Sequence, residues 1–136
     1  MKTKKHIFAL IMFTVATLLT GCSNDDSPSS VQNTDSILNK WWYDSGDFTA
    51  DIYFHSNGEY EQLITLFGSN IGSSGYWQWT DESAGIMKIT GLSGGGQAAS
   101  EVWFKFSNIT EHSFTLQQST DGSNYSEPFN YIDTND

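Results

Sequence analysis

Few side chains in this sequence have the types and spacing that acid–base chemistry requires. His55 shares a predicted strand face with Asp51, and Glu59 and Glu61 lie on one face of the next predicted strand. A histidine–aspartate pair can activate a nucleophile, and two carboxylates can act on a glycosidic bond. No nucleophile is fixed near either pair, and on so acidic a chain the two glutamates indicate a solvated face. We therefore expect no catalytic residues and no enzyme activity.

Sites for metal ions or phosphate are not indicated either. His112 lies at a different predicted turn from His55, and no metal-ligand spacing joins the two. The glycines at 94–96 are not followed by the Lys-Ser/Thr of a phosphate loop. The turns at Asp81 and Asp121 lack the alternating carboxylates of a calcium loop. We expect neither a metal nor a cofactor.

Cys22, the single cysteine of the chain, is a candidate for covalent modification. A basic start precedes an apolar run at residues 7–19, which is too short to span a bilayer and is followed by small residues, as in a signal peptide. The sequence Leu19–Cys22 resembles the lipobox of bacterial lipoproteins. This resemblance implies a lipoprotein signal peptide at residues 1–21 and acylation of Cys22. Each methylene of an attached acyl chain contributes roughly 0.8 kcal/mol to membrane binding.

The chain is strongly acidic, with 16 Asp and Glu against 6 Lys and a formal net charge of −10. Residues 1–21 hold three of the lysines and no carboxylate, so their removal makes the charge more negative by three. Such a surface releases few phosphate counterions and is repelled by anionic headgroups. We expect no nucleic-acid partner, and we expect the acyl anchor on Cys22 to hold the protein at the membrane unaided.

Residues 22–36 are polar apart from one valine, which predicts a lipidated flexible linker. Directly after Cys22, the acidic stretch Ser23–Asp26 resembles the export signal of Bacteroidetes-type lipoproteins. This implies a lipid-anchored protein of the cell outer membrane that is displayed on the cell surface. An anchor that faces the periplasm is the alternative.

Alternation of polar and apolar residues dominates residues 37–136, without a helical period longer than two turns. The expected strands are 41–44, 48–55, 60–67, 76–80, 86–90, 101–109, 113–118 and 125–132. Asn57-Gly58 predicts a type I′ hairpin turn, residues 68–75 and 91–99 are expected to be loops, and Pro128 suggests an edge, a bulge or a barrel seam. This pattern predicts an all-β, antiparallel up-and-down meander that closes into an eight-stranded barrel.

Several motifs of this domain resemble the small lipocalin-like domains of bacterial lipoproteins. They are Leu38–Trp41, Ile52–Tyr60, Gly75–Trp77, Phe104–Thr110 and Phe114–Leu116. The resemblance covers nearly the whole domain and implies a lipocalin-like barrel at residues 37–136. The family pattern has glycine where this chain has Asn39.

Strand parity divides the aromatic side chains between two faces. The predicted inner face holds Trp41, Phe54, Trp77, Trp79, Phe104 and Phe106. The predicted outer face holds Tyr53, Tyr76, Trp42 and Trp103. Side chains can just fill an eight-stranded barrel, so we expect a packed interior rather than a roomy calyx.

Two functions remain open. The first is a non-enzymatic binding module that holds a small apolar or glycan ligand at a barrel mouth formed by residues 68–75 and 91–99. Its candidate ligand-binding residues are Trp77, Trp79, Trp103 and Tyr53. The alternative is a structural or interaction protein of the cell envelope with a filled barrel, which presents aromatics or carboxylates to another envelope protein. A cavity of about 300 Å³ or more would favour the first function, and a filled core the second.

Overall fold

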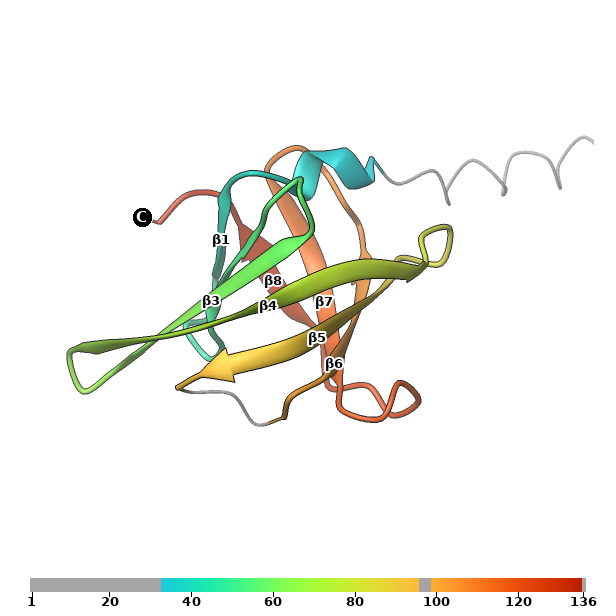
Figure 1. Ribbon diagram of the computed structural model, residues 1–136. Helices are drawn as coiled ribbons and strands as arrows, with labels where there is room; N and C mark the ends of the chain where they lie inside the picture. Colours follow the sequence, from blue (N-terminus) through green and yellow to red (C-terminus); the bar gives the residue numbers. More distant parts are fainter. Residues whose placement is uncertain (1–32, 96–98, 136) are drawn as a thin grey trace, which may run out of the picture. The chain divides into compact units, whose positions relative to one another are not determined.

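The computed structural model describes residues 33–95 and 99–135, and this part of the chain forms a β-barrel (Figure 1). The predicted signal peptide at residues 1–21, Cys22 and most of the predicted linker at 22–36 lie outside the described residues. In chain order the elements are a 3-10 helix at Thr34–Ile37 and the strands β1 Trp41–Asp44, β2 Asp51–Phe54, β3 Glu59–Leu66, β4 Ser69–Asp81, β5 Ile86–Gly94, β6 Val102–Ser107, β7 Ser113–Ser119 and β8 Phe129–Ile132.

The strands form a closed antiparallel barrel in which each strand pairs with the next one in sequence. The barrel closes between β1 and β8, where Tyr43 lies opposite Ile132 and Asp44 opposite Tyr131. The prediction of an all-β, eight-stranded up-and-down barrel is therefore confirmed. Pro128 directly precedes β8, so its missing N–H removes no bond from the ladder at this seam.

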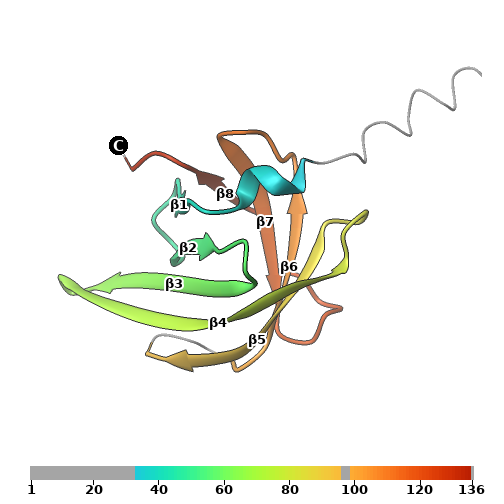
Figure 2. The ribbon, with the colours of Figure 1, turned by 45° about the horizontal axis from the view of Figure 1, so that its top comes forward.

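The 3-10 helix covers one end of the barrel, which we call the closed end (Figures 1 and 2). Ile37 of this helix is fully buried, and the indole Nε1 of Trp42 donates a 2.8 Å hydrogen bond to its carbonyl oxygen. The Thr34 hydroxyl donates to the Glu82 carboxylate at 2.6 Å. Burial of Ile37 thus orders the chain from Thr34 onward, a few residues before the expected end of the linker.

Asn39 makes the turn from the helix into β1 with a φ of 60°. Asparagine tolerates this left-handed conformation better than most residues because its short polar side chain can hydrogen-bond locally. Its backbone N–H donates to the Phe54 carbonyl at 2.7 Å, and its side-chain oxygen accepts from the Ser56 N–H at 2.9 Å. Asn39 therefore provides the backbone conformation that a glycine would otherwise supply at this position.

The predicted type I′ turn occurs at a different hairpin from the one expected. Of the Asn57-Gly58 pair only Gly58 has a positive φ, 94°, and His55 N–H donates to the Glu59 carbonyl at 2.9 Å, as in a three-residue loop. The two-residue turn lies instead at Phe67-Gly68, where φ is 53° and 79°. The prediction for Asn57-Gly58 was wrong because loop length, and not the dipeptide alone, selects the turn type.

This tight turn places β4 where the sequence predicted a loop at residues 68–75. Leu66 pairs with Ser69, and the ladder continues without a break to Glu59 opposite Tyr76. The glycines and serines of this segment have low intrinsic β propensity. These residues nevertheless form part of β4, because they pair in register with β3.

A β-bulge extends β5 past the expected end at residue 90. Thr90 pairs with Tyr76 and Ser93 with Ser74, so Gly91 and Leu92 together face Gly75. A Cβ atom on Gly75 would lie 2.6 Å from the Thr90 carbonyl oxygen, which explains why a residue without a side chain lies there. On a regular strand Leu92 would point outward, because Met87 and Ile89 point inward. The extra residue of the bulge turns Leu92 inward, where it is only 8% exposed.

The face assignment of the first strand was wrong. Trp42 is fully buried, whereas Trp41 is partly exposed and its ring packs edge-on against Tyr53 on the outer face, 5.4 Å between centroids. Asp44 shares the inner face with Trp42 and is only 4% exposed. An aspartate at that parity makes the Trp42 face look solvated in the sequence, since carboxylates are rarely buried without partners.

The face assignment of β6 is confirmed. Phe104 and Phe106 are 2% and 1% exposed, and Trp103, which directly precedes Phe104, lies on the outer face. Phe106 contacts the rings of Phe54 at 5.7 Å and Phe114 at 5.1 Å between centroids. These aromatic contacts fill the closed end of the barrel as expected.

Candidate functional site

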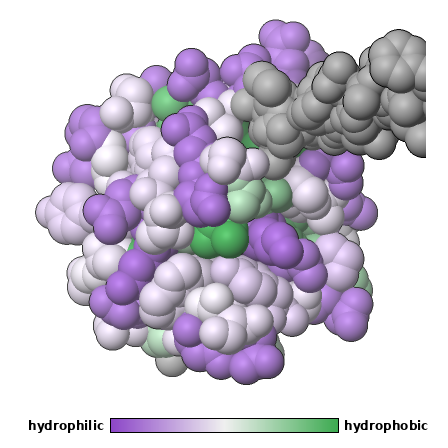
Figure 3. Space-filling model, turned by 90° about the vertical axis from the view of Figure 1, so that its right-hand side faces the viewer, coloured by the Kyte–Doolittle hydropathy of each residue, from purple (hydrophilic) through white to green (hydrophobic). Residues whose placement is uncertain are grey.

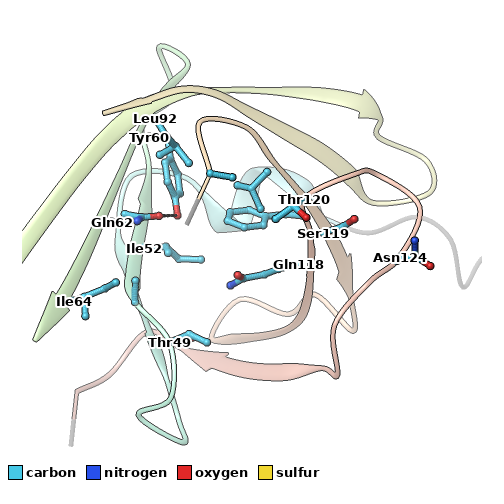
Figure 4. A pocket seen from close by; sticks show the side chains of 14 residues that line it. Thr49, Ile52, Tyr60, Gln62, Ile64, Leu92, Gln118, Ser119, Thr120 and Asn124 are labelled. Carbon is cyan, nitrogen blue, oxygen red and sulfur yellow. Dashed lines mark hydrogen bonds between the residues drawn. The ribbon is translucent and has the colours of Figure 1, made fainter. Parts of the chain in front are cut away.

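A cavity of about 380 Å³ lies at the open end of the barrel, opposite the 3-10 helix (Figure 4). Its volume falls in the range of small-molecule sites, roughly 300 to 1,000 Å³. Its apolar lining includes Ala50, Ile52, Ile64, Leu92, Val102 and Phe104. Its polar lining includes Thr49, Tyr60, Gln62, Gln118, Ser119 and Asn124. The interior is therefore packed at the closed end, and the cavity occupies the open end.

The cavity is electrically neutral. Of the described residues that line it, none has a side chain that is charged at neutral pH. Burial raises the pKa of the Tyr60 hydroxyl well above its ordinary value, and neighbouring Tyr131 raises it further. Tyr60 thus stays protonated, and the excess negative charge of the chain does not extend into the cavity lining.

Two glutamine side chains bring hydrogen-bonding groups into the cavity. The Tyr60 hydroxyl donates to Oε1 of Gln62 at 3.1 Å, and the side chain of Gln118 extends inward from β7 (Figure 4). Among the described residues, neither Nε2 of Gln62 nor the side-chain amide of Gln118 has a hydrogen-bond partner. A donor and an acceptor are therefore free for a ligand.

Asp44 organises the β1–β2 loop at the rim of the cavity. Its carboxylate accepts hydrogen bonds from the backbone N–H groups of Gly46 at 3.0 Å and of Phe48 and Thr49 at 2.9 Å. It also accepts from the Thr49 hydroxyl at 3.0 Å, which in turn lies 2.6 Å from the Tyr131 hydroxyl. These bonds fix Thr49, and with it one side of the mouth.

Asp44, Gln62 and Gln118 were not predicted from the sequence as site residues. A signal for the two glutamines was present, since each occupies an inward parity position on a strand whose neighbouring inward residues are apolar or aromatic. A polar residue at such a position marks either a buried hydrogen bond or a cavity. Only the barrel shows that both amides meet the same cavity.

The four predicted ligand-binding residues lie elsewhere. Trp77 and Trp79 face inward at the closed end, where their rings contact each other at 6.3 Å and Trp77 Nε1 donates to the His55 carbonyl at 2.8 Å. Tyr53 on β2 and Trp103 on β6 both face outward, on different sides of the barrel. None of the four lines the cavity, and their part in ligand binding stays a prediction.

The outward aromatics have separate surroundings. Tyr53 packs between Trp41 and the His55 ring, whose centroid is 4.3 Å away. Trp103 lies under the Lys88 ammonium, 4.7 Å from the ring centroid. The structure therefore does not bring Tyr53 and Trp103 into one aromatic platform.

The histidines pair with carboxylates in two separate places. His55 Nε2 lies 2.8 Å from Glu61, and not beside Asp51 as the sequence suggested. His112 Nδ1 lies 2.9 Å from Asp133, and this contact and the Lys40 ammonium hold the pKa of the Asp133 carboxyl below its ordinary value. Within the described ranges, no three His, Cys, Asp or Glu side chains are grouped so that they could hold a metal ion.

Comparison with family models, curated proteins and solved structures gives no match to this chain. In the described part of the chain there is no helix of sufficient length and hydrophobicity to cross a membrane. The face seen in Figure 3 is mostly hydrophilic, with a small hydrophobic patch. The cavity is therefore the feature of this protein that bears most directly on its function.

Proposed function

We propose that this protein is a lipid-anchored binding module of the outer membrane that holds a small apolar or glycan ligand and catalyses no reaction. The observation that carries the proposal is the cavity of about 380 Å³ at one end of an otherwise filled barrel. Filling this volume with side chains would make the protein more stable, because unfilled apolar space lowers the free energy of unfolding. An empty space is therefore unexpected in a barrel that needs only a stable core. Its neutral, largely apolar lining suits a small organic molecule.

The connection of the barrel to its proposed anchor supports this function. The described chain enters the barrel at Thr34, at the end opposite the mouth of the cavity. The ten residues between Cys22 and Asn33 span at most roughly 33 to 36 Å when extended. The anchor would keep the module close to the membrane.

The proposal predicts that the cavity binds a neutral apolar fluorophore and that a bulky side chain at its rim blocks binding. In the mature chain carrying Cys22→Ser, N-phenyl-1-naphthylamine should bind with increased fluorescence. Ala50→Trp should weaken binding at least about tenfold, which corresponds to about 1.4 kcal/mol, because the indole would occupy the cavity. Fluorescence titration gives the dissociation constants.

The matched control is Phe48→Trp, which changes the same loop at a side chain that is 84% exposed. It should bind the fluorophore as the unsubstituted chain does. Equal affinities for the Ala50→Trp and Phe48→Trp variants would contradict a ligand site in this cavity.

A second candidate function is an interaction protein of the cell envelope. The observation that favours it is the exposed apolar tip of the β3–β4 hairpin, which projects from the barrel (Figures 1 and 2). Phe67 at this tip is fully exposed and Leu66 is 45% exposed. If the unsubstituted chain bound no fluorophore, this second function would become the better explanation.

The proposed acylation of Cys22 can be tested separately from ligand binding. Cys22→Ala should abolish labelling by a palmitate analogue in the native host and release the protein from the membrane fraction or stall its processing. The barrel should keep its stability, because the substitution leaves the buried core of the described structure unchanged. Persistent labelling of the variant would contradict acylation at Cys22.

A further inference from the structure

We infer that the cavity selects uncharged ligands with an apolar body and one amide or hydroxyl group, and that Gln118 and Gln62 recognise that polar group. The inference rests on the proposed binding function and narrows its ligand class. It excludes fatty-acid carboxylates, whose apolar tails the cavity would otherwise suit. Three features of the cavity carry it: its charge, its free hydrogen-bonding groups and its apolar walls.

The first feature is the absence of a cation from the described cavity lining. The three described lysines are engaged on the outside: Lys40 with Asp133 at 3.0 Å, Lys88 with Glu101 at 3.2 Å, and Lys105 over the ring of Tyr125. A carboxylate that entered the cavity would lose its hydration and meet no compensating positive charge.

Two carboxylates of the protein form hydrogen bonds with residues that line the cavity. Asp44 bonds to Thr49 on one side of the mouth, and Asp121 accepts a 2.8 Å hydrogen bond from the Ser119 hydroxyl on another. Both acids make the potential at the mouth negative, which further disfavours an anionic ligand. Selection against anions is thus a property of the whole open end.

The second feature is the pair of glutamine amides. The bond from the Tyr60 hydroxyl occupies Oε1 of Gln62 and leaves its Nε2 to donate. Gln118 extends into the cavity with both a donor and an acceptor, free of partners in the described structure (Figure 4). An amide or hydroxyl group both donates and accepts, so it can satisfy these groups, whereas a hydrocarbon leaves them unpaired.

The third feature is the set of apolar walls that receive the body of the ligand. Ile52, Ile64, Leu92 and Val102 come from four different strands and line the same space. Ile52 lies between the two glutamines in Figure 4. A ligand with its polar group at the amides can therefore bury its apolar part against these side chains.

The test compares three eight-carbon probes in displacing N-phenyl-1-naphthylamine from the mature chain that carries Cys22→Ser. Octanamide and 1-octanol should displace the fluorophore, and octanoate at pH 7.5 should be at least about tenfold weaker. If octanoate competes as well as octanamide while the fluorophore binds, the inference is overturned and the proposed function stands. If the fluorophore does not bind, both are overturned.

Variants assign the recognition to particular residues. Gln118→Leu and Gln62→Leu should each lower the affinity for octanamide about tenfold relative to the affinity for the fluorophore, as expected for one lost hydrogen bond with an unpaired partner. Gln78→Leu, at an exposed outward position of β4, is the matched control and should change neither affinity. Unchanged octanamide affinity in Gln118→Leu would overturn the assignment, and retained fluorophore binding shows that the variant is folded.

Discussion

Trp42→Ala should lower the free energy of unfolding by about 3 to 5 kcal/mol, whereas Trp41→Ala should lower it by only about 1 kcal/mol. Trp42 is fully buried, and its ring lies 4.6 Å from that of Phe114. Its removal would leave a cavity in the closed end and deprive the Ile37 carbonyl of its 2.8 Å hydrogen bond. Trp41 loses mainly its edge-on contact with Tyr53.

Urea denaturation of the two variants, followed by circular dichroism, measures this difference. A domain of this kind has a total stability of roughly 5 to 15 kcal/mol, so Trp42→Ala would remove a large part of it. A larger loss in Trp41→Ala than in Trp42→Ala would mean that β1 is shifted by one residue, since a one-residue slip exchanges the two faces of a strand.

Asp44→Ala should lower the free energy of unfolding by about 3 kcal/mol and also weaken ligand binding. Asp44 is 4% exposed and accepts bonds from three backbone N–H groups and one hydroxyl. Bonds to a charged acceptor contribute roughly 1.5 to 3 kcal/mol each, and part of this sum returns when the freed loop is hydrated. The loop that carries Thr49 and Ala50 would lose its fixed position at the mouth.

Two measurements separate the effects of this substitution. Chemical denaturation gives the loss of stability, and amide hydrogen exchange of Phe48 and Thr49 should speed up selectively. Asp47→Asn is the control, because Asp47 is exposed in the same loop. This substitution should change the free energy of unfolding by no more than about 0.5 kcal/mol. Unchanged exchange at Phe48 in Asp44→Ala would show that the carboxylate does not hold the loop.

The fold class could be read from the sequence because alternation is a local property. Along β6, each inward residue is apolar and each outward one is Trp103, Lys105 or Ser107, so parity gave Phe104 and Phe106 correctly. Short turns between consecutive alternating segments left an antiparallel meander as the economical arrangement. Neither step needs knowledge of distant contacts.

Local patterns failed where a distant contact outweighs them. Asp44 lies on the inner face of β1 beside Trp42, because its partners are backbone groups of the following loop, which the pattern of the strand does not reveal. Residues 68–75 have the composition of a loop and are strand because β3 pairs with them in register. In both places the free energy depends on hydrogen bonds that the sequence alone does not locate.

By itself, the sequence determined the all-β meander, its closure into eight strands and the inward direction of the β6 phenylalanines, since each follows from side-chain period and turn spacing. Only the tertiary structure decided that Trp42 is buried, that a bulge at Gly91 turns Leu92 inward, and that the barrel is filled at one end and hollow at the other. A cavity is the space left after all side chains have packed. Its volume, and the meeting of Gln62 with Gln118 in it, depend on every strand at once.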